Sequence, residues 1–139
     1  MRGLIKERAM KEILIIEDHE TLLTIYSNFL SSLGVETLKA KSVWEAADTL
    51  ITQKIDLVLL DLNLPEMDGK DFIDIIYEHD PNLKVIVCSV EPVERQIELI
   101  PTAVDYFDKS QSFHLLLRKV AYALYNDHPN RAQNYLKVR

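Results

Sequence analysis

Short apolar segments alternate with stretches of helical periodicity along most of this chain. Five short segments are predicted to be strands, because aliphatic runs of this length are typical of strands covered on both faces of a parallel sheet. They are residues 13–16, 35–40, 55–60, 83–88 and 104–107. Between and after them, apolar residues recur with the spacing of one buried helix face. The predicted helices are residues 20–33, 42–53, 68–79, 91–100 and 112–126.

Residues that start or stop helices stand at the ends of these segments. Gly34 follows the first helical stretch as a C-terminal stop. Ser42 and Glu45 have the spacing of a capping box, in which each side chain satisfies a free backbone donor. Pro81 disfavours helical geometry in the residue before it, and Pro92 is tolerated in a first helical turn. Helix ends therefore fall where the periodicity also ends.

The regular alternation of strands and helices predicts an α/β fold class. Right-handed crossovers place helices on both faces of a parallel sheet. We expect a single-domain, doubly wound sheet of five strands in the flavodoxin-like order 2-1-3-4-5, with five helices. Residues 11–126 form this domain, residues 1–10 are an N-terminal extension, and residues 127–139 are a polar C-terminal tail or linker.

Composition and charge narrow the function classes. With 139 residues, 47% of them hydrophobic and 27% charged, the chain is long enough to bury a core without staples. The net charge of −6 opposes nonspecific binding to nucleic acid. No apolar run approaches the roughly 20 residues that cross a bilayer, and the N-terminus does not resemble a secretory signal, so we expect a cytoplasmic protein without membrane contact. The single cysteine, Cys88, lies in an apolar run and is expected to be a buried structural thiol.

Acidic residues gather where two predicted strands end. Glu17 and Asp18 follow the first strand, and Asp61 follows the third. In open α/β sheets, ligands bind beyond the carboxyl ends of the strands, where the strand order reverses. Two carboxylates about 4 Å apart repel by roughly 4 kcal/mol at an effective dielectric constant near 20, which favours a bound cation. Oxygen ligands with few protein contacts suit magnesium together with a substrate phosphate.

A carboxylate aligned with a phosphoryl donor is a competent nucleophile, so Asp61 can form an aspartyl-phosphate. Lys109, after the fifth strand, would supply a positive charge, and Ser89, after the fourth, a hydroxyl donor. Each residue also has a purely structural explanation as a cap, a surface residue or, for Tyr106, strand packing. Their joint position at the ends of four strands favours one functional site.

These residues resemble the receiver domain of response regulators in two-component signal transduction, including the chemotaxis receivers, over roughly residues 11–126. The motif comprises Glu17-Asp18, the sequence DLNLPEMDG around Asp61, Ser89, and Tyr106-Phe107-Asp108-Lys109. As a set it is highly specific.

The resemblance implies a metal and phosphoryl site. Asp61 would be the phospho-acceptor. Asp18, Asp61 and the backbone carbonyl of Asn63 would bind Mg²⁺ directly, and Glu17 would act partly through water. The cofactor implied is therefore Mg²⁺.

The resemblance also implies a switch and its partners. Lys109 would contact the phosphoryl group, while Ser89 and Tyr106 would rearrange after phosphorylation. The donor would be a sensor histidine kinase or a histidine phosphotransfer protein. Output would go to a downstream protein partner or to a missing effector domain, and homodimers through the fourth helix and fifth strand are common in the family.

Three departures from the family pattern stand out. Ser110 replaces the usual proline after the lysine, which often follows a cis bond, so the loop is expected to differ. Val90 stands where a smaller residue is common and is expected to narrow access to Asp61. The segment 91–105 contains Pro101 and lacks the usual glycine before the fifth strand, so an atypical output face is expected.

Two alternatives remain at this point. A magnesium-dependent phosphohydrolase with an aspartyl nucleophile would usually carry a second acid two residues after it, and here that residue is Asn63. A receiver-like interaction module that never accepts phosphate is opposed by the intact set of acids. We therefore expect a phospho-accepting switch that can slowly dephosphorylate itself rather than a turnover enzyme.

Overall fold

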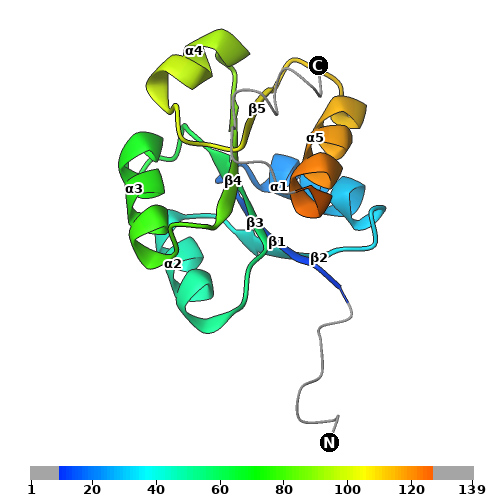
Figure 1. Cartoon of the computed structure of the whole chain (residues 1–139), viewed down its shortest axis with the longest axis horizontal. Helices are drawn as coiled ribbons and strands as arrows, with labels where there is room; N and C mark the ends of the chain where they lie inside the picture. Colours follow the sequence, from blue (N-terminus) through cyan, green and yellow to red (C-terminus); the bar gives the residue numbers. More distant parts are fainter. Residues whose placement is uncertain (1–9, 127–139) are drawn as a thin grey trace, which may run out of the picture.

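The structure, a computed structural model, describes residues 10–126 and has a central parallel sheet between two layers of helices (Figure 1). Within the described chain the order is β2-β1-β3-β4-β5, and every pairing is parallel. This confirms the predicted doubly wound fold class. The strands are β1 (Glu12–Ile16), β2 (Glu36–Ala40), β3 (Leu57–Asp61), β4 (Lys84–Ser89) and β5 (Asp105–Asp108).

The predicted extension, domain and tail lie only partly within the described residues. Residues 1–9 of the predicted extension and the whole predicted tail, 127–139, lie outside the described residues. That division remains a prediction.

The helices cover both faces of the sheet (Figure 1). They are α1 (Glu20–Ser31), α2 (Val43–Thr52), α3 (Gly69–His79), α4 (Val93–Leu99) and α5 (Phe113–Tyr125). One apolar cluster joins the sheet to α2, α3 and α4, and the other joins it to α1 and α5. Successive side chains of a strand point to opposite faces. Along β3, Leu57 and Leu59 therefore pack in the second cluster, while Val58 and Leu60 pack in the first.

Caps fix the starts of several helices near the predicted positions. The Ser42 hydroxyl accepts a hydrogen bond from the backbone N–H of Glu45 at 3.1 Å. The Glu45 carboxylate in turn accepts a hydrogen bond from the backbone N–H of Lys41 at 2.8 Å. In a standard capping box the donor would be the N–H of Ser42, one residue later. After the C-terminus of α1, Gly34 adopts a φ of 73°, which suits a residue without a Cβ. Every predicted element is present, with bounds within two residues of those expected.

Helix α4 begins at Val93 rather than Glu91, a difference of two residues that the end of α1 and the start of β3 also show. Pro92 is its N-cap residue and not part of its first turn. Residues 90 and 91 form a bend, in which the N–H of Glu91 donates to the Ser89 hydroxyl at 3.1 Å. The loop between β4 and α4 is thus shaped by a side chain of the strand end.

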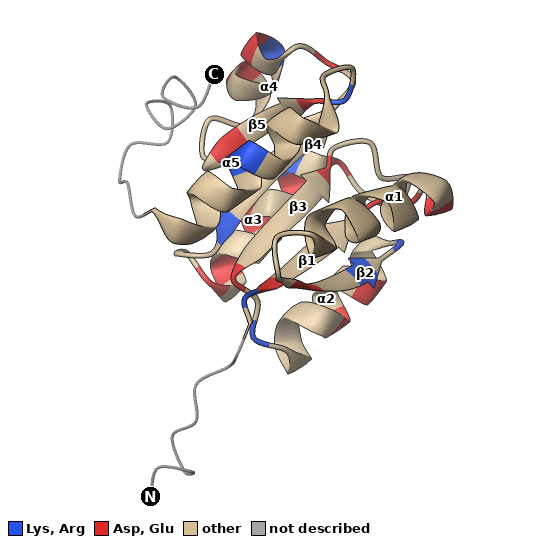
Figure 2. Cartoon of the chain, turned by 90° about the vertical axis from the view of Figure 1, so that its right-hand side faces the viewer, with Lys and Arg blue, Asp and Glu red and all other residues tan. Residues whose placement is uncertain are grey.

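Charged residues are dispersed over the face covered by α1 and α5 (Figure 2). Helix α1 carries charge only at its first residue, Glu20. Lysine and arginine form no continuous patch on the face that Figure 2 presents. In the interior, Cys88 is 1% exposed, and burial raises the pKa of its thiol, which confirms the predicted buried cysteine.

Candidate functional site

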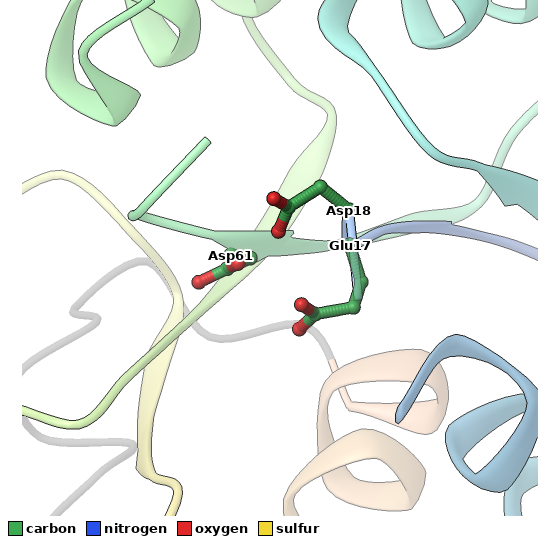
Figure 3. Close-up of side chains that lie close together, drawn as sticks. All are labelled: Glu17, Asp18 and Asp61. Carbon is green, nitrogen blue, oxygen red and sulfur yellow. The ribbon is translucent and has the colours of Figure 1, made fainter. Parts of the chain in front are cut away.

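Three carboxylates converge at the carboxyl end of the sheet (Figure 3). Glu17 and Asp18 follow β1, Asp61 ends β3, and one oxygen from each lies within 4.8 Å of the others. Strands β1 and β3 are neighbours, which brings residues 44 positions apart in the sequence together. Glu17 and Asp61 are buried, whereas Asp18 is exposed. The structure thus assembles the three acids that the sequence placed at strand ends.

Lys109 is the cation inside this cluster. Its Nζ lies 3.0 Å from Glu17 Oε1 and 3.0 Å from Asp61 Oδ1. Burial alone would lower the pKa of Lys109, but the charges of Asp61 and Glu17 outweigh it and hold the pKa above its usual value. Burial, followed by the charge of Asp61, raises the pKa of Glu17, and Lys109 opposes that rise only in part. The lysine therefore compensates the carboxylates incompletely.

The donor set fits a divalent magnesium ion. Three ionised carboxylates and one ammonium leave a formal charge of about −2, which one Mg²⁺ would balance. Carboxylate oxygens from only two strand ends leave room for the waters that magnesium retains. The exposed Asp18 opens the cluster to solvent on one side. The residues present are thus compatible with the predicted cofactor.

The loop after β3 is folded around Asp61. The backbone N–H of Asn63 donates to Asp61 Oδ1 at 3.1 Å, and Asp68 caps α3 through the N–H of Lys70 at 3.0 Å. These bonds fix the loop that carries the Asn63 carbonyl, whose predicted role as a metal ligand stays a prediction.

Gly69 lies against the same loop. A Cβ at Gly69 would lie 2.6 Å from Leu62 Cδ2 and 2.9 Å from the Leu62 Cα, so the backbone would have to shift. We expect Gly69→Ala to lower the free energy of unfolding by about 1–3 kcal/mol through overpacking. Urea unfolding measures this. A value equal to that of the unchanged protein would contradict the close approach.

Ser89 closes the site from β4. Its side chain is 1% exposed, and its carbonyl accepts a hydrogen bond from the backbone N–H of Lys109 at 2.8 Å. The predicted hydroxyl donor therefore lies on the strand next to Asp61, in direct backbone contact with Lys109. A cavity of about 210 Å³ lies beside it, lined by Leu62, Asn63, Asp68, Lys70, Ser89, Glu91, Leu99 and Ile100.

Tyr106, the second predicted switch residue, is buried. Its hydroxyl donates to the Ile100 carbonyl at the end of α4 at 2.5 Å. In the register of β4 and β5, Tyr106 lies opposite Val87, two residues before Ser89. The tyrosine thus connects β5 to α4 in this structure, and its pairing with Ser89 stays a prediction.

The departures from the family pattern have local explanations. Ser110 donates from both its N–H and its hydroxyl to Asp108 Oδ1 at 2.8 Å, which shapes the loop without proline. The described residues contain no cis peptide bond. Val90 is 69% exposed, and its effect on access to Asp61 stays a prediction. Helix α4 is only seven residues long.

Three buried polar side chains on α4, α5 and β5 were not predicted. Gln96 of α4 is fully buried, and Lys119 of α5 is buried against Asp105 of β5. Gln96 and Lys119 each stand three residues after a buried apolar residue of their own helix, but an apolar pattern does not indicate a buried polar side chain, because it contains no information about partners on other elements.

The sequence is similar to response regulators and their receiver domains. A family model described as the response regulator receiver domain matches residues 13–121. The transcriptional regulatory protein YxdJ of Bacillus subtilis is 30% identical over 112 residues, which cover 80% of this chain and 49% of YxdJ. The chemotaxis protein CheY of Thermotoga maritima is 35% identical over 80 residues, which cover 57% of this chain and 67% of CheY. This chain thus spans about half the length of YxdJ.

A solved structure agrees with the fold. The response regulator protein TrrA of Thermotoga maritima, determined in complex with Mg(2+)-BeF, is 27% identical with a TM-score of 0.76. The match covers 83% of this chain and 100% of the TrrA chain. Among the described helices, none is long and apolar enough to cross a membrane.

Proposed function

Because this chain belongs to the response regulator receiver domain family, we propose that it accepts a phosphoryl group on Asp61 in a magnesium-dependent reaction and thereby switches a protein-interaction surface. Receiver domains are signalling modules of two-component systems and are generally not turnover enzymes. The roles of individual residues are part of this proposal.

The observation that carries the proposal is the contact of Lys109 with both Glu17 and Asp61, beside Asp18. A lysine Nζ 3.0 Å from the acceptor carboxylate stands where a transferred phosphoryl oxygen would develop charge. The flanking acids supply metal ligands within 4.8 Å of the same carboxylate. An acceptor, a cation for the phosphoryl oxygens and a metal-ligand set are therefore held at the carboxyl ends of β1, β3 and β5.

In the proposed reaction an Asp61 carboxylate oxygen attacks phosphorus. A bond between that oxygen and phosphorus forms while the bond to the leaving group breaks, either a phosphohistidine nitrogen or an acetyl phosphate oxygen. Lys109 and the Ser89 hydroxyl donate hydrogen bonds to the phosphoryl oxygens, and the Asn63 N–H holds the carboxylate in line. Asp18, Asp61 and the Asn63 carbonyl would hold Mg²⁺, with Glu17 acting partly through water, and the ion would supply positive charge to the transferring group.

Phosphorylation replaces the single negative charge of the Asp61 carboxylate with a phosphoryl group of nearly −2 charge beside Lys109. To reverse a two-state equilibrium fully, the group must favour one state by about 5.5 kcal/mol. Ser89 and Tyr106 would carry this bias toward α4 and β5, because Ser89 lies at the site and the Tyr106 hydroxyl binds the end of α4. The surface formed by α4 and β5 is then the proposed output.

The proposed partners follow from this reaction. Receiver domains interact with sensor histidine kinases and with downstream partners. We propose a sensor histidine kinase or histidine phosphotransfer protein as donor, and a protein partner, an effector domain or a second copy of the chain as receiver of the signal. A cytoplasmic location and the absence of direct nucleic-acid contacts belong to the same proposal.

Intact mass spectrometry tests the proposed function. The protein is incubated with acetyl phosphate and Mg²⁺, with and without a chelator, and the modified peptide is then mapped. We expect one phosphoryl adduct, on the peptide containing Asp61, that the chelator prevents. Rapid multiple turnover of p-nitrophenyl phosphate would instead support a phosphohydrolase. If neither acetyl phosphate nor a histidine kinase produced an adduct, the result would support an interaction module that takes no phosphate.

Lys109→Met separates the lysine's contribution from that of the metal ligands. Phosphorylation is expected to slow by about 10²–10³-fold, because one preorganised donor to the phosphoryl oxygens is lost. Magnesium affinity is expected to stay equal or rise, because the ammonium no longer competes for Glu17 and Asp61. Adduct formation over time and calorimetric titration with Mg²⁺ measure the two effects.

The matched control is Lys54→Met, which removes an exposed lysine from the loop before β3. It should change neither quantity. A phosphorylation rate of Lys109→Met within two-fold of the Lys54→Met rate would contradict the proposed role of Lys109.

A further inference from the structure

Gln96 is a fully buried glutamine on the inner face of α4. Its Nε2 donates two hydrogen bonds, to the Glu91 carbonyl at 2.8 Å and to the Phe107 carbonyl at 3.0 Å. Two carbonyl acceptors fix the orientation of the amide, because the reversed amide would place its oxygen against both carbonyl oxygens. One side chain of α4 therefore binds the β4–α4 loop and β5 together.

These bonds link the two sides of the phosphoryl site. Glu91, whose carbonyl Gln96 binds, donates its N–H to the Ser89 hydroxyl at 3.1 Å. Phe107 precedes Lys109 by two residues, and the Lys109 N–H donates to the Ser89 carbonyl at 2.8 Å. Gln96 thus completes a closed ring of hydrogen bonds and backbone that contains both Ser89 and Lys109.

The other end of the Gln96 amide has no partner. Among the residues that the structure describes, its Oε1 is the buried side-chain atom that lacks a hydrogen bond. A buried acceptor without a partner is destabilising, and native structures retain such atoms only rarely. Filling space under α4 requires no amide, since an apolar side chain of similar size would avoid the unpaired oxygen. The two donated bonds are therefore the property that distinguishes glutamine here.

We propose that Gln96 is a positioning residue that holds Ser89 and Lys109 in register for phosphoryl transfer and transmits changes at Ser89 to α4. Its two hydrogen bonds go to Glu91 and Phe107 and not to Glu17, Asp18 or Asp61, so it acts on the site through Glu91 and Phe107. A displacement of Ser89 toward a phosphoryl group on Asp61 moves Glu91 through its N–H, and Gln96 passes that movement to α4. This inference rests on the proposed function of Asp61.

The test compares Gln96→Met with Gln53→Met. Methionine preserves the length of the side chain but donates no hydrogen bond, and Gln53 is an exposed glutamine at the far end of α2. We expect phosphorylation by acetyl phosphate at saturating Mg²⁺ to slow about tenfold in Gln96→Met, because small misplacements of catalytic groups reduce rates strongly. The dissociation constant for Mg²⁺ should stay within two-fold of the unchanged protein. Gln53→Met should match the unchanged protein in both.

Hydrogen exchange of the α4 amides tests whether Gln96 transmits changes at Ser89 to α4. Mg²⁺ with beryllium fluoride is the probe, and it is expected to change exchange across α4 in the unchanged protein but much less in Gln96→Met. Gln96→Asn, whose amide is one methylene too short to reach both carbonyls, should give an intermediate result. Gln96→Asn replaces Gln96→Met in both measurements if Gln96→Met does not fold.

Three results would overturn the inference. Equal phosphorylation rates and equal exchange changes in the Gln96 variants and Gln53→Met would remove the role of Gln96 while leaving Asp61 as acceptor. A parallel loss of phosphorylation and magnesium affinity would assign Gln96 a purely structural role. An unchanged protein that forms no adduct would remove the proposed function and this inference together.

Discussion

Asp61→Asn is expected to eliminate the magnesium-dependent phosphoryl adduct completely while leaving the fold intact. An amide oxygen is a far weaker nucleophile than a carboxylate, so no bond to phosphorus forms. The asparagine oxygen can still accept hydrogen bonds from Lys109 and from the Asn63 N–H, which now bind Asp61 Oδ1. The substitution also removes the negative charge of Asp61, which lies beside that of Glu17. Intact mass after incubation with acetyl phosphate measures the adduct.

Asp74→Asn is the matched control for this substitution. It changes the same chemical groups at an exposed position on α3 and should retain full adduct formation. Thermal unfolding should show Asp61→Asn at least as stable as the unchanged protein, because the repulsion between Glu17 and Asp61 is relieved. An adduct of unchanged yield on Asp61→Asn would mean that another residue accepts the phosphoryl group.

The fold and the acidic cluster were predictable from the sequence because both depend on local pattern. Aliphatic runs fix where strands lie, and the connection rules for parallel sheets then limit the strand order. Once β1 and β3 are neighbours, Glu17, Asp18 and Asp61 must meet at one edge of the sheet. No knowledge of side-chain packing is needed for that step.

Packing inside the α4 and α5 layers was not predictable in the same way. Gln96 is buried because carbonyls of a loop and of β5 accept its bonds, and those carbonyls are 5 and 11 positions away in the sequence. Lys119 stands on the inward face of α5, where Asp105 and the Tyr106 carbonyl are partners of its ammonium group. An apolar pattern reports which face of a helix is inward, but it does not report polar groups that are buried in pairs.

Asp105 and Lys119 form a buried ion pair between β5 and α5. Lys119→Met is expected to lower the free energy of unfolding by about 3–5 kcal/mol at pH 7, because a buried carboxylate is left without its cation. Lys119 Nζ lies 3.5 Å from Asp105 Oδ1, both side chains are almost fully buried, and Nζ also donates to the Tyr106 carbonyl. Proteins are stable by only about 5–15 kcal/mol, so this loss is a large fraction of the total. Urea unfolding at several pH values measures it.

The pH dependence identifies the unpaired carboxylate as the cause. Burial raises the pKa of Asp105 even though Lys119 opposes the rise, and removing Lys119 should raise that pKa further. An acid with a raised pKa in the folded state stabilises the fold fully below its unfolded pKa of about 3.9, and this contribution is lost as the pH rises through the folded pKa. The deficit of Lys119→Met should therefore shrink between pH 7 and pH 4. Asp105→Asn in the same chain should restore most of the stability at pH 7.

Lys41→Met provides the comparison for a surface ion pair. Lys41 lies 3.7 Å from Glu20, and both side chains are more than half exposed. Its loss should change the free energy of unfolding by less than about 1 kcal/mol and should show little dependence on pH over the same range. If Lys119→Met behaved like Lys41→Met, the buried pair would not stabilise the packing of α5 on β5. If the double variant with Asp105→Asn were as unstable as Lys119→Met alone, the lost packing of the lysine stem, rather than the uncompensated charge, would account for the effect.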